Sequence, residues 1–357
     1  MKISKKILAA VIAALMVLSL CSCSDTSVTK ENTAENSENT EDANTEKEIE
    51  IAKGDAFAVY SEDDNSLRFY RSSEKNILKN GDTYNNLIVT DAFTGFENDT
   101  YDIDTDMPPW YSYCELIEKV YFEDAISPAS CAYWFYEFSN CDSINLSSLD
   151  TSDVSYMEYM FSGCVSLTEL DLSSFDTSAV TSMEGMFSDC ASLAELDLSS
   201  FNTFCVTDMT QMFVYCTSLT KLDLSSFNTS IVRNMEGMFS DCTSLTELDL
   251  SSFDTSSATN MKSMFSDCAS LTELDLSNFD TSSVTNMENM FYNCTSLATI
   301  YAGNWTDEAV NCEDFENMFL NGTSLLGAIS YSSENTDLNY ANYETGYFTE
   351  PISNDQT

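Results

Sequence analysis

The chain has 357 residues, of which 43% are hydrophobic, so it is long enough for one extended domain or two compact ones. Its 14 basic residues stand against 59 acidic ones, and the formal net charge of −45 argues against nucleic-acid binding and against docking on anionic lipid through a basic patch. Histidine is absent, which excludes a Ser-His-Asp triad, a Cys-His pair and a His-ligated zinc site.

The N-terminus has the pattern of a secretory signal. Three lysines among the first six residues precede an apolar run over residues 7–20, which is too short to span a bilayer comfortably. The run ends in Leu20-Cys21-Ser22-Cys23, which resembles the lipobox of bacterial lipoproteins. This resemblance implies a lipoprotein signal peptide over residues 1–22, lipid attachment at Cys23, and a chain anchored on the extracellular side of a bacterial membrane. An ordinary signal peptide with two incidental cysteines is the alternative.

Two segments of different composition follow the signal. Residues 23–53 are mostly Ser, Thr, Asn, Glu and Asp, and such a segment buries too little apolar surface to offset its ordering entropy. We therefore predict an acidic disordered tether over this range. Residues 54–117 contain strand-like runs at residues 57–60 and 67–70, which predict a small β-rich N-terminal cap.

Residues 118–325 repeat with a constant step of 26 residues. A fixed period of this size is typical of a solenoid, in which each unit buries its apolar side chains against its neighbours. The units become irregular at both ends, and we predict a C-terminal cap and tail over residues 326–357. The repeated residues are the pairs Met160-Phe161, Met186-Phe187, Met212-Phe213, Met238-Phe239, Met264-Phe265 and Met290-Phe291, and the cysteines Cys164, Cys190, Cys216, Cys242, Cys268 and Cys294.

Each unit combines two apolar periodicities. Residues 245–253 alternate at their centre, which predicts a short strand with its leucines inward. The spacing of Val and Met in residues 232–239 places their side chains on one helical face, and three units carry a capping-box pattern, at Ser155, Thr181 and Thr285. We therefore predict an α/β solenoid of strand–turn–helix units, with one parallel sheet and helices on its other side.

The six repeated cysteines allow three interpretations. A metal stack is disfavoured because no Cys-x-x-Cys pair occurs, and a disulfide ladder is conceivable at the spacing of neighbouring strands. We favour buried free thiols, since Cys is a small apolar filler. We accordingly expect no metal site and no cofactor. The pairing of the cysteines outside this set stays open.

The outward positions of the predicted strands are mostly acidic. Five aspartates side by side repel one another, so a cationic partner or divalent ions would relieve the repulsion. The alternative is that the acids only keep the surface soluble. A catalytic role is not expected, because no pair of acids is distinguished from the rest. The candidate ligand-binding residues are Glu169, Asp171, Glu195, Asp197, Asp223, Glu247, Asp249, Glu273 and Asp275.

The spacing Leu-x-x-Leu-x-Leu-x-x-Phe resembles the leucine-rich repeat, with Phe where that pattern has Asn or Cys. Together with the elements Met-Phe-x-x-Cys-x-Ser-Leu and Asp-Thr-Ser-x-Val-Thr-x-Met, it resembles the BspA-type leucine-rich-repeat surface protein family of bacteria, over residues 56–349. The resemblance implies a leucine-rich-repeat-like horseshoe with the acidic positions on its concave sheet.

The resemblance also implies a function outside catalysis. We expect a monomeric surface protein that adheres, through the repeats, to a protein or glycan of a host or neighbouring cell, and that contacts the membrane only through its lipid anchor. A structural spacer or coat of the cell envelope, without a specific ligand, is the alternative.

Overall fold

The computed structural model describes residues 48–101, 107–303, 305 and 311–351. The chain divides into two units, Met1–Lys47 and Glu48–Thr357, and every described residue belongs to the second. The predicted signal peptide, the lipid attachment at Cys23 and the predicted tether up to residue 47 therefore lie outside the described residues. No helix in the described part of the chain is long and apolar enough to cross a membrane.

The N-terminal part of the second unit is rich in strands, as its sequence predicts. β2 (Ala56–Ser61) and β3 (Ser66–Arg71) form an antiparallel pair. Because successive side chains of a strand point to opposite faces, Ala58 and Tyr60 of β2 join the main core, while Phe57 and Val59 join a second, smaller core.

The second core also includes residues of β1 (Glu48–Ile51), which pairs antiparallel with β4 (Asn76–Lys79). The predicted start of the cap at residue 54 is therefore wrong by six residues, since β1 lies in the range assigned to the tether. The other elements of this part are β5 (Thr83–Tyr84), β6 (Leu87–Ile88), β7 (Asp91–Thr94), the 3₁₀ helices η1 (Phe96–Asn98) and η2 (Tyr111–Tyr113), β8 (Lys119–Phe122) and β9 (Ser143–Asn145).

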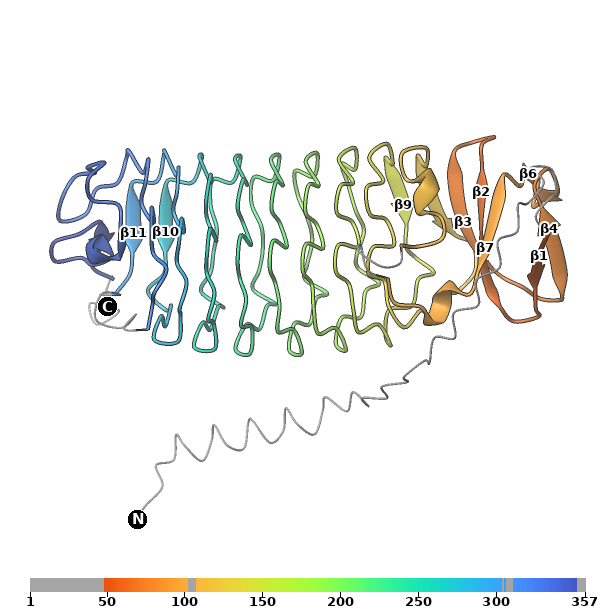
Figure 1. The fold of residues 1–357 in the computed structure, drawn as a ribbon, viewed down its shortest axis with the longest axis horizontal. Helices are drawn as coiled ribbons and strands as arrows, with labels where there is room; N and C mark the ends of the chain where they lie inside the picture. The colour runs from red at the N-terminus through yellow and green to blue at the C-terminus, as the bar shows by residue number, and fades with distance from the viewer. Residues whose placement is uncertain (1–47, 102–106, 304, 306–310, 352–357) are drawn as a thin grey trace, which may run out of the picture. The chain divides into compact units, whose positions relative to one another are not determined.

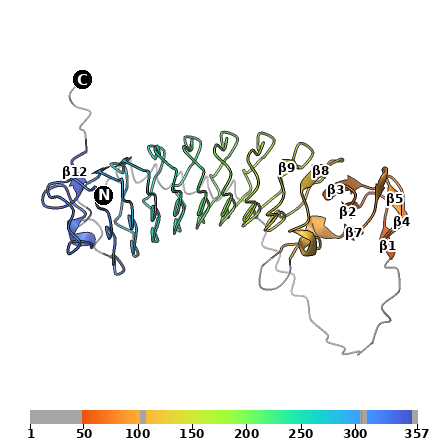
Figure 2. The same ribbon diagram turned by 90° about the horizontal axis from the view of Figure 1, so that it is seen from above.

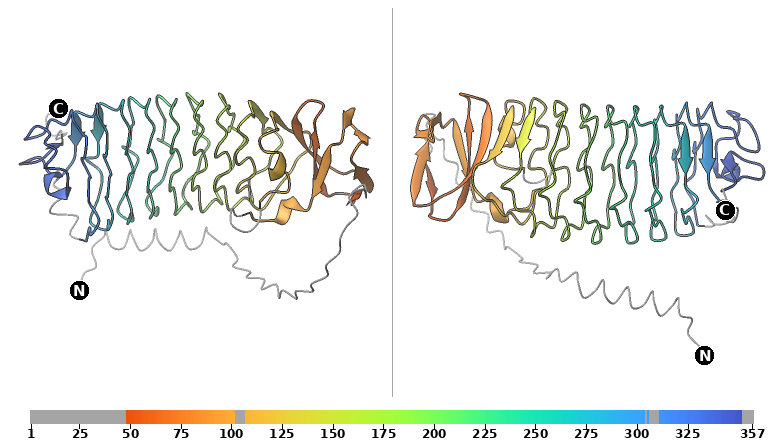
Figure 3. Two further views of the ribbon diagram at one scale, coloured as in Figure 1. Left: turned by 45° about the horizontal axis from the view of Figure 1, so that its top comes forward. Right: turned by 180° about the vertical axis from the view of Figure 1, so that it is seen from behind.

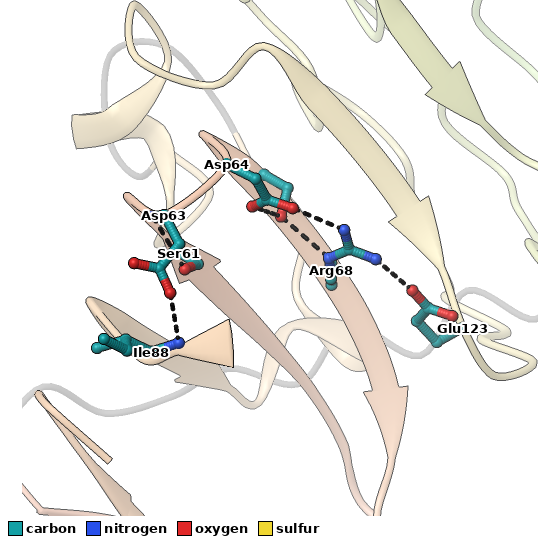
Figure 4. A network of polar contacts seen from close by, with 7 residues as sticks. Ser61, Asp63, Asp64, Arg68, Ile88 and Glu123 are labelled. Atoms are coloured by element: carbon teal, nitrogen blue, oxygen red, sulfur yellow. Dashed lines mark hydrogen bonds and ion pairs between the residues drawn. The ribbon is translucent and has the colours of Figure 1, made fainter. Parts of the chain in front are cut away.

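One mixed sheet, in the order β7-β2-β3-β8-β9, joins the cap to the first repeats. A polar network reinforces the parallel pairing of β3 with β8 (Figure 4). Arg68 donates from Nη2 to Asp64 at 2.8 Å and from Nη1 to Glu123, directly after β8, at 2.6 Å. Arg71 binds Glu97 and donates to the carbonyl of Ala125 at 3.1 Å. Two of the three arginines in the sequence thus hold the cap on the repeats.

Beyond β9 the chain forms successive coils, one for each 26-residue unit, which follow one another in all views (Figures 1, 2 and 3). Equivalent residues of neighbouring coils form isolated parallel bridges, so the predicted period is the true structural period. The bridged pairs are Tyr156–Ser182, Ser182–Asp208, Asp208–Asn234, Asn234–Asn260, Asn260–Asn286 and Asn286–Asp314.

The predicted helices are wrong: residues 48–101, 107–303 and 311–351 contain no α-helix. In a helix each N–H donates to the carbonyl four residues earlier. Here the N–H groups of Met183, Gly185 and Phe187 instead donate to the next coil, 25 residues ahead, at 2.8–3.0 Å. The N–H groups between them close three-residue turns, such as Met186 to Met183 at 3.2 Å. Alternate donors are therefore committed to the neighbouring coil.

The proposed capping boxes are wrong for the same reason. Thr181 and Thr285 use their hydroxyls to donate to the carbonyl oxygens of Ser155 and Thr259 in the preceding coil, at 3.2 and 3.0 Å. These side chains join coils where a capping residue would satisfy its own helix.

The predicted parallel sheet is also not formed, so the assignment to an α/β solenoid is wrong. Parallel strands occur only near the two ends of the described repeats: at β8 and β9, and at β10 (Glu273–Asp275) and β11 (Thr299–Tyr301). The corresponding segments of four units, residues 169–171, 195–197, 221–223 and 247–249, contain no strand. Figure 1 shows them as coil between β9 and β10.

The inward-facing residues of the units are those that the sequence predicts. The repeated Met, Phe and Cys residues are buried, and no disulfide joins the cysteines of the described residues. Each repeated thiol donates to the carbonyl of a phenylalanine in the preceding coil, as in Cys216 Sγ to Phe187 O at 3.1 Å and Cys242 Sγ to Phe213 O at 3.1 Å. Cysteine therefore fills space and also satisfies a buried acceptor.

We expect the six repeated thiols to resist alkylation in the folded protein. Burial raises the pKa of Cys216 and of Cys294 to about 12, so these thiols stay protonated and unreactive at pH 8. Iodoacetamide at pH 8, followed by peptide mass spectrometry, should label the half-buried Cys205 and Cys312 first, and the repeated cysteines only after denaturation. Rapid labelling of Cys216 in the folded chain would contradict this arrangement.

A column of buried threonines joins the coils at a second place. Thr203 Oγ1 donates to the carbonyl of Asn228 at 2.9 Å and accepts from the N–H of Asn228 at 2.7 Å. Thr177 makes the same pair of bonds with Asn202, at 3.0 and 2.8 Å. Each hydroxyl thus satisfies both backbone groups of one residue in the next coil.

The C-terminal segment closes the row of coils. β12 (Phe348–Thr349) extends the parallel sheet β10-β11-β12, and it follows the 3₁₀ helix η3 (Leu338–Tyr340). Phe348 and Trp305 are buried with their rings 5.0 Å apart. The aromatic residues at this end therefore form a cover for the last apolar layer.

Candidate ligand-binding surface

The outward acids of the repeats gather along one surface, which we call the acidic face. Leu196, Leu248 and Leu274 are buried, and the acids on either side of each are exposed. The alternation predicted for this part of the unit is therefore correct, even where no strand forms. A groove of about 1400 Å³ runs along this face. Its lining includes Glu195, Asp197, Asp223, Glu247, Asp249, Glu273 and Asp275, whereas the predicted Glu169 and Asp171 are exposed outside it.

Charge on the acidic face is one-sided. Lys221 carries the only positive charge among the described residues that line the groove. Clefts lined by one sign of charge focus the field and raise the local concentration of oppositely charged partners. Within the described part of the chain no group of three or more His, Cys, Asp or Glu residues could hold a metal ion. The surface therefore suits an extended cationic partner better than a single coordinated ion.

Each aspartate of the acidic face also has a local role. Asp197 Oδ1 accepts from the N–H of Ser199 at 2.9 Å, and Asp223 and Asp249 accept in the same way from Ser225 and Ser251. Hydrogen bonds from the serine side chain, and then from its N–H, lower the pKa of Asp197 and of Asp223. One carboxylate oxygen of each aspartate thus closes a turn, and the other remains open to solvent or a ligand.

The first repeat shows that this turn does not need a charge. Asn145 occupies the equivalent position, and its Oδ1 accepts from the N–H of Ser147 at 3.1 Å. An Asp-to-Asn change on the acidic face therefore removes charge while it retains the turn.

The coils lie further apart near the acidic face than at their Met-Phe edge. Phe161 and Phe187 stack with ring centroids 5.7 Å apart, whereas Phe175 and Phe201, just after the leucines, are 6.5 Å apart. The lost strand pairing on this side agrees with the wider spacing. A concave surface requires closer spacing, so the predicted concave sheet is wrong, and the acids lie on the side toward which the coils diverge.

A second hollow, of about 880 Å³, lies where the cap meets the first repeats, and we call it the tyrosine pocket. It is lined by Tyr133, Tyr136, Tyr156, Tyr159, Glu158 and Glu184, together with small or polar residues. The sequence analysis did not single out these residues. Their signal is a departure from the repeat: Tyr156 and Tyr159 stand where the next unit has Ser182 and Gly185.

Comparison with known proteins shows the family of the repeats. The profile of a family described as "Mycoplasma protein of unknown function, DUF285" matches residues 129–244 and again residues 218–332, which together span more than half of the chain. The chain belongs to the DUF285 family. The two overlapping matches confirm that the resemblance is to a family of repeat proteins. The DUF285 match does not extend to the predicted lipoprotein signal.

Outside the DUF285 profile the comparisons say little. No curated protein matches the chain. A solved structure of a leucine-rich cell surface protein from Faecalibacterium prausnitzii A2-165 is 14% identical, with 84% of this chain and 98% of that chain covered. The TM-score is 0.23, so this likeness carries no argument about the fold.

Proposed function

We propose that this DUF285 protein is a non-catalytic binding protein of the bacterial cell surface, held by a lipid at Cys23, which adheres to a macromolecule through its acidic face. The observation that supports binding is the groove of about 1400 Å³ with seven acidic residues and one basic residue in its lining. A long groove with one sign of charge suits a basic segment of a protein, because complementary charge steers encounter.

Two further points support the cellular part of the proposal. The N-terminal sequence resembles a lipoprotein signal. The structural relative from Faecalibacterium prausnitzii is described as a cell surface protein. The absence of catalysis is proposed because the acids are evenly repeated, and none is enclosed with a partner that would separate their protonation states.

A binding assay with a matched control tests the acidic face. The test variant carries Asp197→Asn, Asp223→Asn, Asp249→Asn and Asp275→Asn in the secreted chain, residues 23–357, with Cys23→Ser. The control variant carries Asp150→Asn, Asp176→Asn, Asp254→Asn and Asp280→Asn. It removes the same charge from a second column of turns, in which Asn202 and Asn228 already accept from the N–H two residues ahead.

The two variants are compared on immobilised extracellular matrix proteins, glycans and whole bacterial cells. We expect the test variant to bind its partner about tenfold more weakly, since four exposed charge contacts each contribute up to about 1 kcal/mol. The control should bind like the parent chain, and added salt should weaken the parent. Equal binding by both variants would exclude the acidic face as the site. If the parent binds nothing, the alternative of an envelope spacer without a ligand is favoured.

A further inference from the structure

The tyrosine pocket presents aromatic rings at right angles. Tyr133 and Tyr159 stack with centroids 5.2 Å apart and planes 19° apart. Tyr136 meets both rings edge-on, at 5.5 Å and 71° from Tyr133 and at 6.4 Å and 89° from Tyr159. Tyr156, 45% exposed, belongs to the same lining and leaves it open to solvent. Aromatic walls that meet at right angles can surround a compact cation with several ring faces.

Two carboxylates complete the lining. Glu184 accepts a hydrogen bond from the hydroxyl of Tyr159 at 2.7 Å, which fixes the ring beside it. Burial raises the pKa of Glu158, and the nearby charges of Glu184 and Asp208 raise it further. None of the described residues that line the pocket is basic. The pocket therefore concentrates negative charge and aromatic surface without a cation of its own.

We propose that the tyrosine pocket binds an alkylammonium group, either the side chain of a lysine or methylated lysine, or a choline-type head group. A cation over the ring faces is attracted by their quadrupole, and it would offset the buried charge of Glu158. A neutral sugar could stack on the same rings but would leave that charge uncompensated. The pocket is distinct from the acidic face, because the two share no lining residue.

Calorimetric titration of the secreted chain with choline tests the proposal. The neutral isostere 3,3-dimethylbutanol, lysine amide and trimethyllysine amide are titrated in parallel, so the lipid-type and peptide-type sources are distinguished. We expect choline or one of the lysine amides to bind, and the isostere to bind at least about tenfold more weakly, which corresponds to a cation–π contribution of the usual size. Equal binding of choline and its isostere, binding of a neutral monosaccharide instead, or no binding by any of the cations would overturn the proposal.

Two variants assign the site, and a third separates it from the acidic face. Tyr136→Leu removes one ring face, Glu158→Gln removes one charge at constant size, and each should weaken binding about tenfold. Circular dichroism and thermal unfolding confirm that each variant folds. The variant with four Asn residues on the acidic face should bind the cation like the parent, so a failure of the proposed function leaves this result unaffected. Unchanged binding in both Tyr136→Leu and Glu158→Gln would place the cation elsewhere.

Discussion

Replacing Thr203 by Val should lower the free energy of unfolding by about 3 kcal/mol, although the two side chains have nearly the same shape. The hydroxyl of Thr203 is completely buried and bonds to both the N–H and the carbonyl of Asn228. Val leaves both backbone groups buried and unpaired, and each such group costs about 1–3 kcal/mol. Urea unfolding, followed by circular dichroism, measures the change.

Thr203→Ser is the matched control for this change. Ser retains the hydroxyl and removes only a methyl group, so we expect a loss of about 1 kcal/mol. If Thr203→Ser were as destabilising as Thr203→Val, packing of the methyl group would be the main contribution, and the hydrogen bonds between coils would be secondary.

Replacing Gly185 by Ala should also destabilise the protein by about 3 kcal/mol, for a steric reason. Gly185 has φ of +57°, and a Cβ built on it would lie 2.3 Å from the ring of Tyr159. The left-handed backbone costs Ala about 1–2 kcal/mol. Displacement of Tyr159 would cost in addition its stacking on Tyr133 and its hydrogen bond to Glu184.

Gly237→Ala separates the two contributions. Gly237 has nearly the same backbone, with φ of +60°, but the nearest atom to an added Cβ is Gln211 Cγ at 3.3 Å. We expect a loss of about 1 kcal/mol, from the backbone alone. The measurement is again the midpoint of urea unfolding. Equal effects of Gly185→Ala and Gly237→Ala would show that the ring of Tyr159 moves away without cost.

The period and the inward residues were predictable because repetition displays them directly. The Met-Phe pairs, the repeated cysteines and the leucines are all apolar at fixed steps of 26 residues, and burial of apolar surface is their dominant energy. The strands β2 and β3 were predictable from alternation for the same reason. These features depend on which side chains avoid water, which the sequence states plainly.

The helices were predicted wrongly because apolar spacing does not say where backbone hydrogen bonds go. A spacing of three between Val, Met and Met fits a helix, yet here it results from consecutive turns with left-handed residues four positions apart. Gly185 and Asp189, and Asn289 and Asn293, are such pairs, with positive φ in every case. Gly, Asn and Asp recurring four apart inside an apolar pattern is the signal that argues against a helix.

The two candidate sites differ in the same respect. The acids of the acidic face were predictable because they occupy one repeated outward position. The tyrosine pocket combines residues of the cap with those of the first two coils, and its rings come from positions where these coils depart from the repeat. Such a site depends on tertiary proximity, which a periodic pattern does not contain.

The constant offsets between bonded partners have a consequence for how such a chain can change in length. A hydroxyl or thiol in one coil always finds its partner at the same place in the adjacent coil, as Thr177 and Thr203 do with Asn202 and Asn228. Gain or loss of 26 residues therefore leaves every remaining bond with an equivalent partner. The number of coils, and with it the reach of the acidic face, is a modular dimension that recombination between repeats can adjust while both ends keep their structure.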